Sequence, residues 1–357
     1  MGRKKPVNIS RDGGIGRRTR LKIVRRNPWE FDSPSRHIAT VTIIQMTKKI
    51  KLLVILGPTA TGKSDLAVEL AHWITDEKIA GYTGAEIISA DSRQVYKGLD
   101  IGTGKITASE MRDIPHYCLD IADVKDRFSV SDWKKSAETA VGEIVARGAL
   151  PIICGGTGYY IDAIANDLEF LDVENDPILQ NELEKKTVED LFAELMVIDP
   201  ARANTMNNGS DNKNKRRLVR SIIIARQLGS VPALNSKSVE SKYEPIYIGV
   251  NVTDEELKLR IKNRLTKRLD AGMVDEAIKL HNSGLSFDRM DELGLEYRYQ
   301  AKLMQGELKN DEFMEMLNTK IWQFARRQKT WFRKNAQIKW FEPTALADIK
   351  DEIVHSF

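Results

Sequence analysis

The sequence predicts an α/β protein with a parallel sheet, because short apolar runs alternate along the chain with segments of helical spacing. The apolar runs are typical of buried parallel strands and cover residues 52–56, 85–91, 150–154 and 243–250. Helical spacing separates the first three of them and follows the third, at residues 65–71, 131–147 and 159–165. Ligands of such sheets bind at the carboxyl ends of the strands, so the residues that follow each strand are the candidates for a site.

A phosphate-binding loop follows the first predicted strand. Residues 57–64 read Gly-Pro-Thr-Ala-Thr-Gly-Lys-Ser and match the pattern G-x-x-x-x-G-K-[ST] at every fixed position. The glycines allow main-chain N–H groups to turn toward a polyphosphate, and the helix that follows adds its positive end. We expect Lys63 to neutralise phosphate oxygens and the Ser64 hydroxyl to ligate Mg²⁺. The loop does not identify the phosphate compound or tell whether a phosphoryl group moves.

Two further strand ends carry polar residues. Asp91 follows the second strand, and an aspartate beside a phosphate loop can bind Mg²⁺ or act as a general base. Its ordinary role would be that of a helix cap or turn residue, and the spacing leaves these interpretations equally open. Gly156-Thr157-Gly158 follow the third strand and place a hydroxyl near the phosphates, although taken alone they are more typical of a plain turn. We expect these two strand ends and the phosphate loop to lie together, and this convergence is stronger evidence for a site than any one of them alone.

Composition limits the functional class. The 357 residues have a formal net charge of +4, but residues 1–45 contain 11 Lys/Arg and 3 Asp/Glu, so the rest of the chain is net acidic. No apolar stretch approaches the ~18 residues of a membrane span, and two cysteines provide neither a disulfide framework nor a four-ligand zinc site. We therefore expect a cytoplasmic protein without membrane contact, whose nucleic-acid surface, if it has one, is built from local clusters. We also expect a monomer, which these observations do not decide.

The first 45 residues differ from the remainder of the chain. They are basic and turn-rich without helical or strand periodicity, so we expect residues 1–45 to form an unstructured basic extension. Three interpretations stay open: a nucleic-acid-binding arm, a targeting segment, or a start assigned too early, with the true chain opening at Met46. The last is favoured because Met46 stands just ahead of the first predicted strand.

Basic clusters occur in the second half of the sequence. Arg260, Arg264 and Arg268 recur every four residues and share one helix face, which by default is solvated. A basic run at 213–220 leads directly into apolar residues, which predicts a half-buried helix with arginines along its edge. Aromatic residues among the basic residues of 322–334 are more typical of a core than of a base-stacking platform.

Six blocks of sequence between residues 51 and 342 resemble the tRNA dimethylallyltransferases in the order of that family. The blocks are the phosphate loop with 88–103, then 114–117, 155–160, 216–220, 260–264 and 323–333. The resemblance implies transfer of a dimethylallyl group from dimethylallyl diphosphate to N6 of adenosine 37 in tRNA, next to the anticodon, with release of diphosphate. The expected fold is a P-loop NTPase-like parallel sheet flanked by helices, with a largely helical C-terminal half. We expect the transferase domain at 46–342, with a shortened helical insertion at about 166–208, and a C-terminal tail at 343–357.

The resemblance also implies roles for particular residues. Asp91 would accept the N6 proton as general base, and the catalytic set would include Lys63, Thr157 and Arg264. The implied diphosphate-binding residues are Gly57, Pro58, Thr59, Ala60, Thr61, Gly62, Lys63 and Ser64, with Ser64 as the ligand of the Mg²⁺ cofactor. The implied tRNA-binding residues are Asp91, Ser92, Arg93, Gln94, Gly158, Arg216, Arg217, Leu218, Val219, Arg220, Glu292, Leu293, Gly294, Leu295, Glu296 and Tyr297. Because the target base must leave its stack, the family implies a channel with tRNA at one mouth and diphosphate at the other.

The sequence departs from the family pattern in three places. The stretch between Tyr160 and Asp199 is shorter than usual, Gln180 stands where arginine is common, and Glu296 stands where glycine is usual. These departures affect the expected grip on tRNA rather than the chemistry. The alternatives are an adenylate isopentenyltransferase that acts on AMP, an ATP-binding small-molecule kinase, and a tRNA-binding protein without catalysis.

Overall fold

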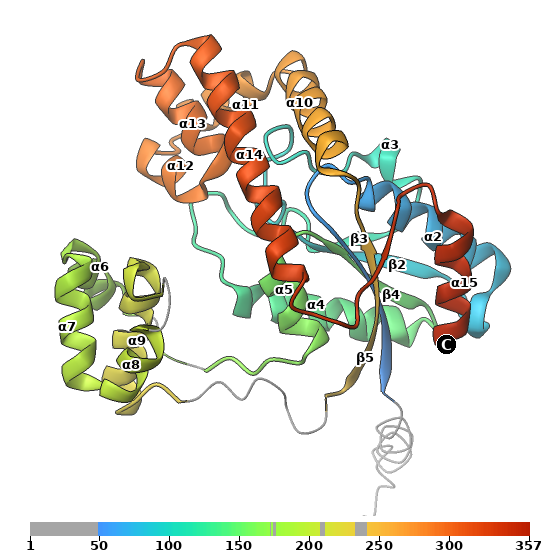
Figure 1. Cartoon of the computed structure of the whole chain (residues 1–357), viewed down its shortest axis with the longest axis horizontal. Helices are drawn as coiled ribbons and strands as arrows, with labels where there is room; N and C mark the ends of the chain where they lie inside the picture. Colours follow the sequence, from blue (N-terminus) through green and yellow to red (C-terminus); the bar gives the residue numbers. More distant parts are fainter. Residues whose placement is uncertain (1–48, 172, 174–175, 208–210, 233–240) are drawn as a thin grey trace, which may run out of the picture. The chain divides into compact units, whose positions relative to one another are not determined.

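The computed structural model describes residues 49–171, 173, 176–207, 211–232 and 241–357, so the extension expected at 1–45 lies outside the described residues. These residues form a six-stranded, all-parallel sheet with the strand order β3-β2-β4-β1-β5-β6 (Figure 1). The strands are β1 (Ile50–Leu56), β2 (Ala85–Ala90), β3 (His116–Tyr117), β4 (Leu150–Gly155), β5 (Tyr243–Val250) and β6 (Lys339–Phe341). The predicted α/β class with a parallel sheet is confirmed.

Helices cover both faces of the sheet, which explains why its central strands are apolar on both sides. Leu53 and Val54 are both fully buried but belong to different cores, because successive side chains of a strand point to opposite faces. The helices α2 and α15 pack on the Leu53 face, and α4 and α5 pack on the Val54 face (Figure 1). These helices are α2 (Lys63–Glu77), α4 (Val130–Ala146), α5 (Gly158–Ala165) and α15 (Leu346–Ser356).

The segment 343–357, which we expected to be a C-terminal tail, contributes to the core. Helix α15 occupies most of it, and the side chains of Ile349 and Ile353 are fully buried among residues of α2 and the sheet. The two isoleucines are four positions apart, so both lie on one face of the helix. The segment therefore closes one face of the sheet.

A helical cluster with its own apolar core follows α5. The expected insertion at about 166–208 ends too early, because the cluster continues to Leu228. Leu218 and Ile222 of the last helix pack in the same core as Leu191 of the second. The cluster consists of α6 (Pro177–Lys185), α7 (Val188–Ile198), α8 (Pro200–Asn207), the short 3₁₀ helix η2 (Asp211–Lys213) and α9 (Lys215–Leu228).

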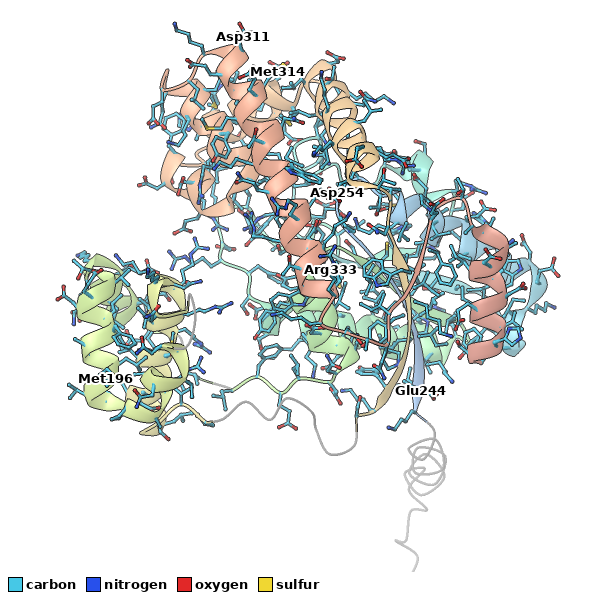
Figure 2. All side chains as sticks on the ribbon, in the orientation of Figure 1. Met196, Glu244, Asp254, Asp311, Met314 and Arg333 are labelled. Carbon is cyan, nitrogen blue, oxygen red and sulfur yellow. The ribbon has the colours of Figure 1, made fainter. Side chains whose placement is uncertain are left out.

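The C-terminal half is largely helical, as predicted. Helix α14 is the longest, with Asp311 near its first residue and Arg333 just beyond its last (Figure 2), and it packs against α10. The helices here are α10 (Asp254–Asp270), α11 (Met273–Asn282), α12 (Phe287–Leu293), α13 (Leu295–Met304) and α14 (Asn310–Phe332). Two short elements complete the fold, η1 (Ile79–Gly81) and α3 (Ala108–Met111). None of the helices in the described ranges is both long and apolar enough to cross a bilayer.

The strand order brings the three predicted strand ends together. Strand β4 lies between β2 and β1, and Gly155 at its end is paired with Ala90 on one side and Leu56 on the other. The residues that follow these strands therefore lie side by side at the carboxyl edge of the sheet. This is the location that the sequence predicted for the site.

Candidate functional site

The phosphate loop connects β1 to α2 and depends on its two motif glycines. A Cβ atom at Gly57 would clash with the carbonyl oxygen of Val250. Gly62 has φ +88°, a left-handed conformation that glycine adopts at low cost, and it forms the N-cap of α2. The loop therefore delivers its main-chain N–H groups and the positive end of α2 to one point, which is a general anion-binding arrangement.

Two cations stand over this loop, and burial perturbs both. Lys63 Nζ donates to the carbonyl oxygen of Pro58 (3.1 Å). Burial lowers the pKa of Lys63, an effect that Cys154 opposes and the charge of Arg264 reinforces. Burial and the neighbouring Arg268 lower the pKa of Arg264 to about 10, so it remains protonated at neutral pH. Because unpaired buried cations are unfavourable, a bound anion would relieve the repulsion between them.

The arginine stripe of α10 faces the site, so the default expectation of a solvated face is wrong. Arg260, Arg264 and Arg268 each donate to oxygens of the phosphate loop or of loop 99–104. Their bonds include Arg260 Nη1 to Thr61 O (3.2 Å), Arg264 Nη1 to Thr59 Oγ1 (3.2 Å), Arg264 Nη2 to Gly104 O (3.2 Å) and Arg268 Nη1 to Gly102 O (3.2 Å). The four-residue spacing placed them on one face, as expected, and packing decided which way that face points.

Asp91 is a turn residue and also lines the candidate site, so the structure is compatible with both interpretations of the sequence, and its role as a base stays a prediction. Its Oδ1 atom accepts hydrogen bonds from the main-chain N–H groups of Arg93 (2.8 Å) and Gln94 (3.3 Å), which makes it a turn residue. The same carboxylate lines a cavity beside Lys63 and Arg264. Within the described part of the chain its hydrogen bonds all go to Oδ1. The turn therefore fixes the carboxylate at the cavity and leaves Oδ2 available to a substrate.

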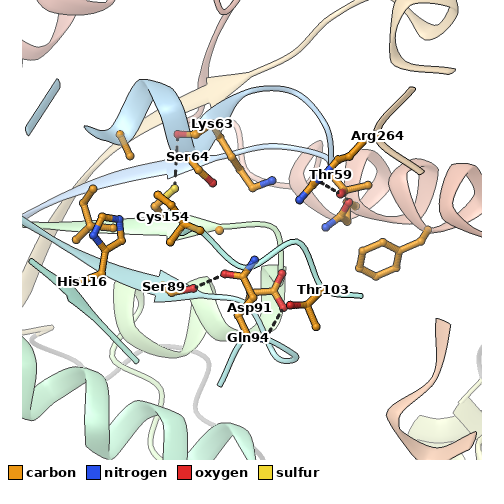
Figure 3. A pocket seen from close by; sticks show the side chains of 16 residues that line it. Thr59, Lys63, Ser64, Ser89, Asp91, Gln94, Thr103, His116, Cys154 and Arg264 are labelled. Atoms are coloured by element: carbon orange, nitrogen blue, oxygen red, sulfur yellow. Dashed lines mark hydrogen bonds between the residues drawn. The ribbon is translucent and has the colours of Figure 1, made fainter. Parts of the chain in front are cut away.

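We call this cavity, of ≈ 70 Å³, the phosphate cavity. Lys63 and Arg264 point into it from one side, and Asp91 and Gln94 point into it from the other (Figure 3). The predicted site residues that line it are Thr59, Lys63, Ser64, Asp91, Gln94 and Arg264. The structure thus assembles the predicted diphosphate end and the predicted base around one space.

Thr157 lies beside this cavity but is not among its lining residues. Its Oγ1 atom accepts a hydrogen bond from the main-chain N–H of Ser92 (3.1 Å), and the residue precedes α5. Thr157 therefore ties the turn after β4 to the turn that holds Asp91. A direct contact between Thr157 and diphosphate stays a prediction.

Gln328 of α14 is a site residue that the sequence analysis missed. Its Oε1 atom accepts from the N–H of Thr59 (2.8 Å) and its Nε2 atom donates to the carbonyl oxygen of Gly156 (2.8 Å). The amide thereby joins the phosphate loop to the turn after β4, and a Cβ at Gly156 would collide with it. The available signal was a polar residue on the buried face of an amphipathic helix, between Ala325 and Phe332.

A second cavity, of ≈ 250 Å³, collects part of the predicted tRNA-binding set, and we call it the arginine cavity. Arg93 lines it from the turn after β2, and burial lowers the pKa of Arg93, with the charge of Arg216 acting in the same direction. The predicted residues that meet there are Arg93, Arg216, Val219, Arg220 and Glu292. The other lining residues are Tyr96, Arg127, Phe128, Gln180, Glu184, Ile223 and Arg289. Positive charges beside apolar surface are typical of sites that bind single-stranded nucleic acid, because the charges contact its phosphates and the apolar surface contacts its unstacked bases.

Other members of the predicted tRNA-binding set have packing roles. Leu218 and Leu293 are fully buried, in the helical cluster and against the sheet core respectively. Glu296 is buried and paired with Arg268 (3.3 Å), and burial raises the pKa of Glu296. Tyr297 is 1% exposed and donates its hydroxyl to a carboxylate of α11. None of these four side chains lines either cavity, so the structure gives them a role in packing.

The parallel sheet, its phosphate loop and the cationic cavity beside it define a P-loop protein with a site for a phosphorylated substrate. A family model described as IPP transferase matches residues 94–335, and the chain belongs to this family. It is 41% identical to tRNA dimethylallyltransferase 1 of Geotalea uraniireducens, over 82% of this chain and 92% of that protein. It is 38% identical to tRNA dimethylallyltransferase 2 of Treponema denticola, over 82% of this chain and 94% of the relative.

Solved structures agree with this assignment. The full-length tRNA isopentenylpyrophosphate transferase of Bacillus halodurans superposes with a TM-score of 0.63 at 32% identity, over 87% of this chain and 97% of that one. A eukaryotic dimethylallyltransferase acting on tRNA shares the fold, with a TM-score of 0.69 at 23% identity over 86% of this chain and 77% of that one. The resemblance noted in the sequence is confirmed, and the protein is an enzyme of the prenyl-transferring class.

Proposed function

We propose that the enzyme transfers the dimethylallyl group of dimethylallyl diphosphate to N6 of adenosine 37 in tRNA, next to the anticodon. The observation that carries this proposal is the phosphate cavity, in which Lys63 and Arg264 face Asp91 across one space. Anion-binding groups and a base are thus held on opposite sides of the position that a reacting carbon would occupy. Membership of the IPP transferase family supports both the donor and the acceptor.

The reaction needs two kinds of assistance, and the cavity offers both. The bond between the allylic carbon and the diphosphate oxygen breaks, and the oxygen keeps the electron pair. Main-chain N–H groups, Lys63 and Arg264 stabilise the charge that builds up on that oxygen. The N6 nitrogen forms the new bond to carbon and loses a proton, which Asp91 accepts. Because the turn fixes Asp91 through Oδ1, this geometry is set before the substrates arrive.

A divalent cation fits the diphosphate end. No group of three or more His, Cys, Asp or Glu side chains that could hold a metal occurs among the residues the structure describes. Mg²⁺ bound through substrate phosphates needs only one or two protein oxygens, however, and the Ser64 hydroxyl at the cavity wall provides one. We therefore propose Mg²⁺ with Ser64 as its protein ligand; when bound, the ion would neutralise charge on the leaving diphosphate.

The arginine cavity supports a polynucleotide acceptor over AMP. Arg216 and Arg220 stand exposed along α9, and with Arg93 they could neutralise several phosphates of one strand. A free nucleotide has a single phosphate group and would use little of this surface. The kinase alternative is weakened for another reason: the arginines of α10 are already bonded to loop oxygens rather than free to close over ATP.

A transfer assay with competing acceptors tests the proposal. Purified enzyme, Mg²⁺ and labelled dimethylallyl diphosphate are incubated with unmodified tRNA, with the same tRNA carrying guanosine at position 37, or with AMP. We expect label on the first acceptor alone. Label on AMP would contradict the proposal, as would ATP consumption with a small phosphate acceptor in a parallel reaction that contains ATP in place of dimethylallyl diphosphate.

A further inference from the structure

A single carboxylate accepts hydrogen bonds from the main-chain N–H groups of three consecutive residues at the edge of the site. Glu276 lies in the first turn of α11 and reaches loop 99–104, which leads from β2 toward α3. Its oxygens accept hydrogen bonds from Asp100 N (3.0 Å), Ile101 N (2.6 Å), Gly102 N (3.0 Å) and Tyr297 Oη (2.7 Å). A carboxylate that accepts several N–H groups is a strong and directional anchor, and the proposed reaction assigns no role to Glu276.

The opposite edge of the same loop is held by cations. Arg268 donates to the carbonyl oxygens of Gly102 (3.2 Å) and Thr103 (3.0 Å). The next carbonyl oxygen, that of Gly104, accepts from both Arg264 Nη2 (3.2 Å) and Gln94 Nε2 (3.2 Å). The loop is therefore clamped between a carboxylate at its N–H groups and guanidinium groups at its carbonyls.

The close fit leaves no room for side chains at two loop positions. A Cβ atom at Gly102 would lie 2.7 Å from the hydroxyl oxygen of Tyr297. Gly104 has φ +59°, and a Cβ there would collide with the guanidinium of Arg268. Any other residue at either place would have to displace Tyr297 or Arg268, and at Gly104 it would also adopt a left-handed conformation that favours glycine. The path of the loop in turn determines where the Gly104 carbonyl meets the two side chains of the phosphate cavity.

We propose that Glu276 is a positioning residue for diphosphate binding: by holding loop 99–104 it places the carbonyl that orients Arg264 and Gln94 in the phosphate cavity. Glu276 does not line that cavity and acts through the loop. The inference rests on the proposed function for the identity of the donor. The anion site itself exists independently of the acceptor, so the two ideas can be separated experimentally.

The test uses Glu276→Gln in the full-length enzyme, with inorganic pyrophosphate and Mg²⁺ as the probe in calorimetry. Glutamine keeps the length of the side chain but turns one acceptor into a donor that faces loop N–H groups. We expect the pyrophosphate Kd and the KM for dimethylallyl diphosphate to rise about tenfold, the effect of removing one hydrogen bond to a charged group. The Kd for tRNA should change less than about twofold, because Glu276 does not line the arginine cavity.

Asp275→Asn is the matched control, because this exposed neighbour lies on the same turn and loses the same charge. It should bind pyrophosphate as the wild type does. A folded Glu276→Gln variant with wild-type pyrophosphate Kd, even with a lowered Tm, would overturn the proposal, as would an equal loss of pyrophosphate affinity in Asp275→Asn.

If Glu276→Gln does not fold, the variant Tyr297→Phe provides the test. Removal of one donor to the carboxylate should weaken pyrophosphate binding about threefold, and an unchanged Kd would refute the positioning role of Glu276.

The proposed function and this inference fail separately. If the wild-type enzyme transfers no label to tRNA, the acceptor assignment is wrong, but the pyrophosphate measurement still decides the role of Glu276. If transfer occurs and the variant binds pyrophosphate normally, only the positioning role is wrong.

Discussion

The phosphate cavity and the arginine cavity are built by different means. The first has ≈ 70 Å³ and is anchored by a contiguous loop, the start of one helix and main-chain hydrogen bonds, and side chains from the turn after β2, α10 and α14 complete its walls. The second has ≈ 250 Å³ and is lined by side chains from the turn after β2, from α6 and α9, and from α12. A backbone-built site fixes the position of a reacting group, whereas a surface of flexible arginines tolerates a large partner and binds it through charge.

This difference implies that substitutions at the two cavities should change different quantities. At the phosphate cavity they should lower the transfer rate or donor affinity and leave tRNA affinity alone. At the arginine cavity they should lower tRNA affinity and its dependence on salt. Four variants test that separation, and they run from the largest expected effect to the smallest.

Asp91→Asn should lower kcat by about 10²–10⁴-fold, because a general base is removed while the amide oxygen still accepts the two turn hydrogen bonds. Single-turnover transfer measures the rate, and filter binding should show an unchanged tRNA Kd. Asp123→Asn is the control, since Asp123 is exposed and accepts from a main-chain N–H two residues ahead, as Asp91 does. Near-normal turnover of Asp91→Asn would remove Asp91 from the chemistry.

Lys63→Ala should raise the Kd for pyrophosphate and the KM for dimethylallyl diphosphate by about 100-fold, because the variant has no buried ammonium to pair with the leaving group. Calorimetry with pyrophosphate gives the affinity directly. The exposed Lys135→Ala on α4 serves as control for the removal of a lysine. Unchanged donor binding in Lys63→Ala would mean that another cation carries the charge.

Arg216→Ala combined with Arg220→Ala should weaken tRNA binding about tenfold. The slope of log Kd against log salt should fall by about 1.4, because each single-strand phosphate that an arginine no longer neutralises accounts for about 0.7. Donor KM should stay the same. Arg226→Ala is the control on the same helix, because that arginine pairs with Glu194 away from the cavity. An unchanged salt dependence would show that the RNA binds elsewhere.

Gln328→Met should have the smallest effect, a rise of a few-fold in donor KM and a decrease of about 1–2 kcal/mol in the free energy of unfolding. Methionine keeps the side-chain length but removes both bonds that join the phosphate loop to the turn after β4. Kinetics and urea unfolding measure the two effects, with the exposed Gln323→Met as control. A decrease in tRNA affinity with normal donor KM would contradict the assignment of Gln328 to the phosphate cavity.

The same contrast explains what could be predicted from the sequence. The phosphate loop and Asp91 were found because their function depends on neighbouring residues, and the strand order β2-β4-β1 then brought them together. Gln328 and Glu276 could not be predicted in this way, because their partners are distant in the sequence. Thr59 lies 269 residues from Gln328, and Ile101 lies 175 residues from Glu276. A lone polar residue in a helix has no local pattern that reveals such a contact.

Non-local packing also explains the misplaced boundaries. The Asn- and Gly-rich stretch before Lys215 resembles the end of an insertion, yet α9 completes the core begun by α6 and α7. The prediction of a C-terminal tail at 343–357 overlooks Ile349 and Ile353, which close one face of the sheet. Both errors arose because turn-rich sequence marks local breaks, whereas membership in a core depends on segments far apart in the chain.

Mapping the prenylated nucleoside tests the central claim most directly. After incubation with dimethylallyl diphosphate and Mg²⁺, the tRNA is digested and its fragments are sequenced by mass spectrometry. The account predicts one added dimethylallyl group, on N6 of the adenosine 3′ to the anticodon. Modification of another nucleoside, attachment at another atom of that adenosine, or no modification by an enzyme that still binds pyrophosphate would contradict it.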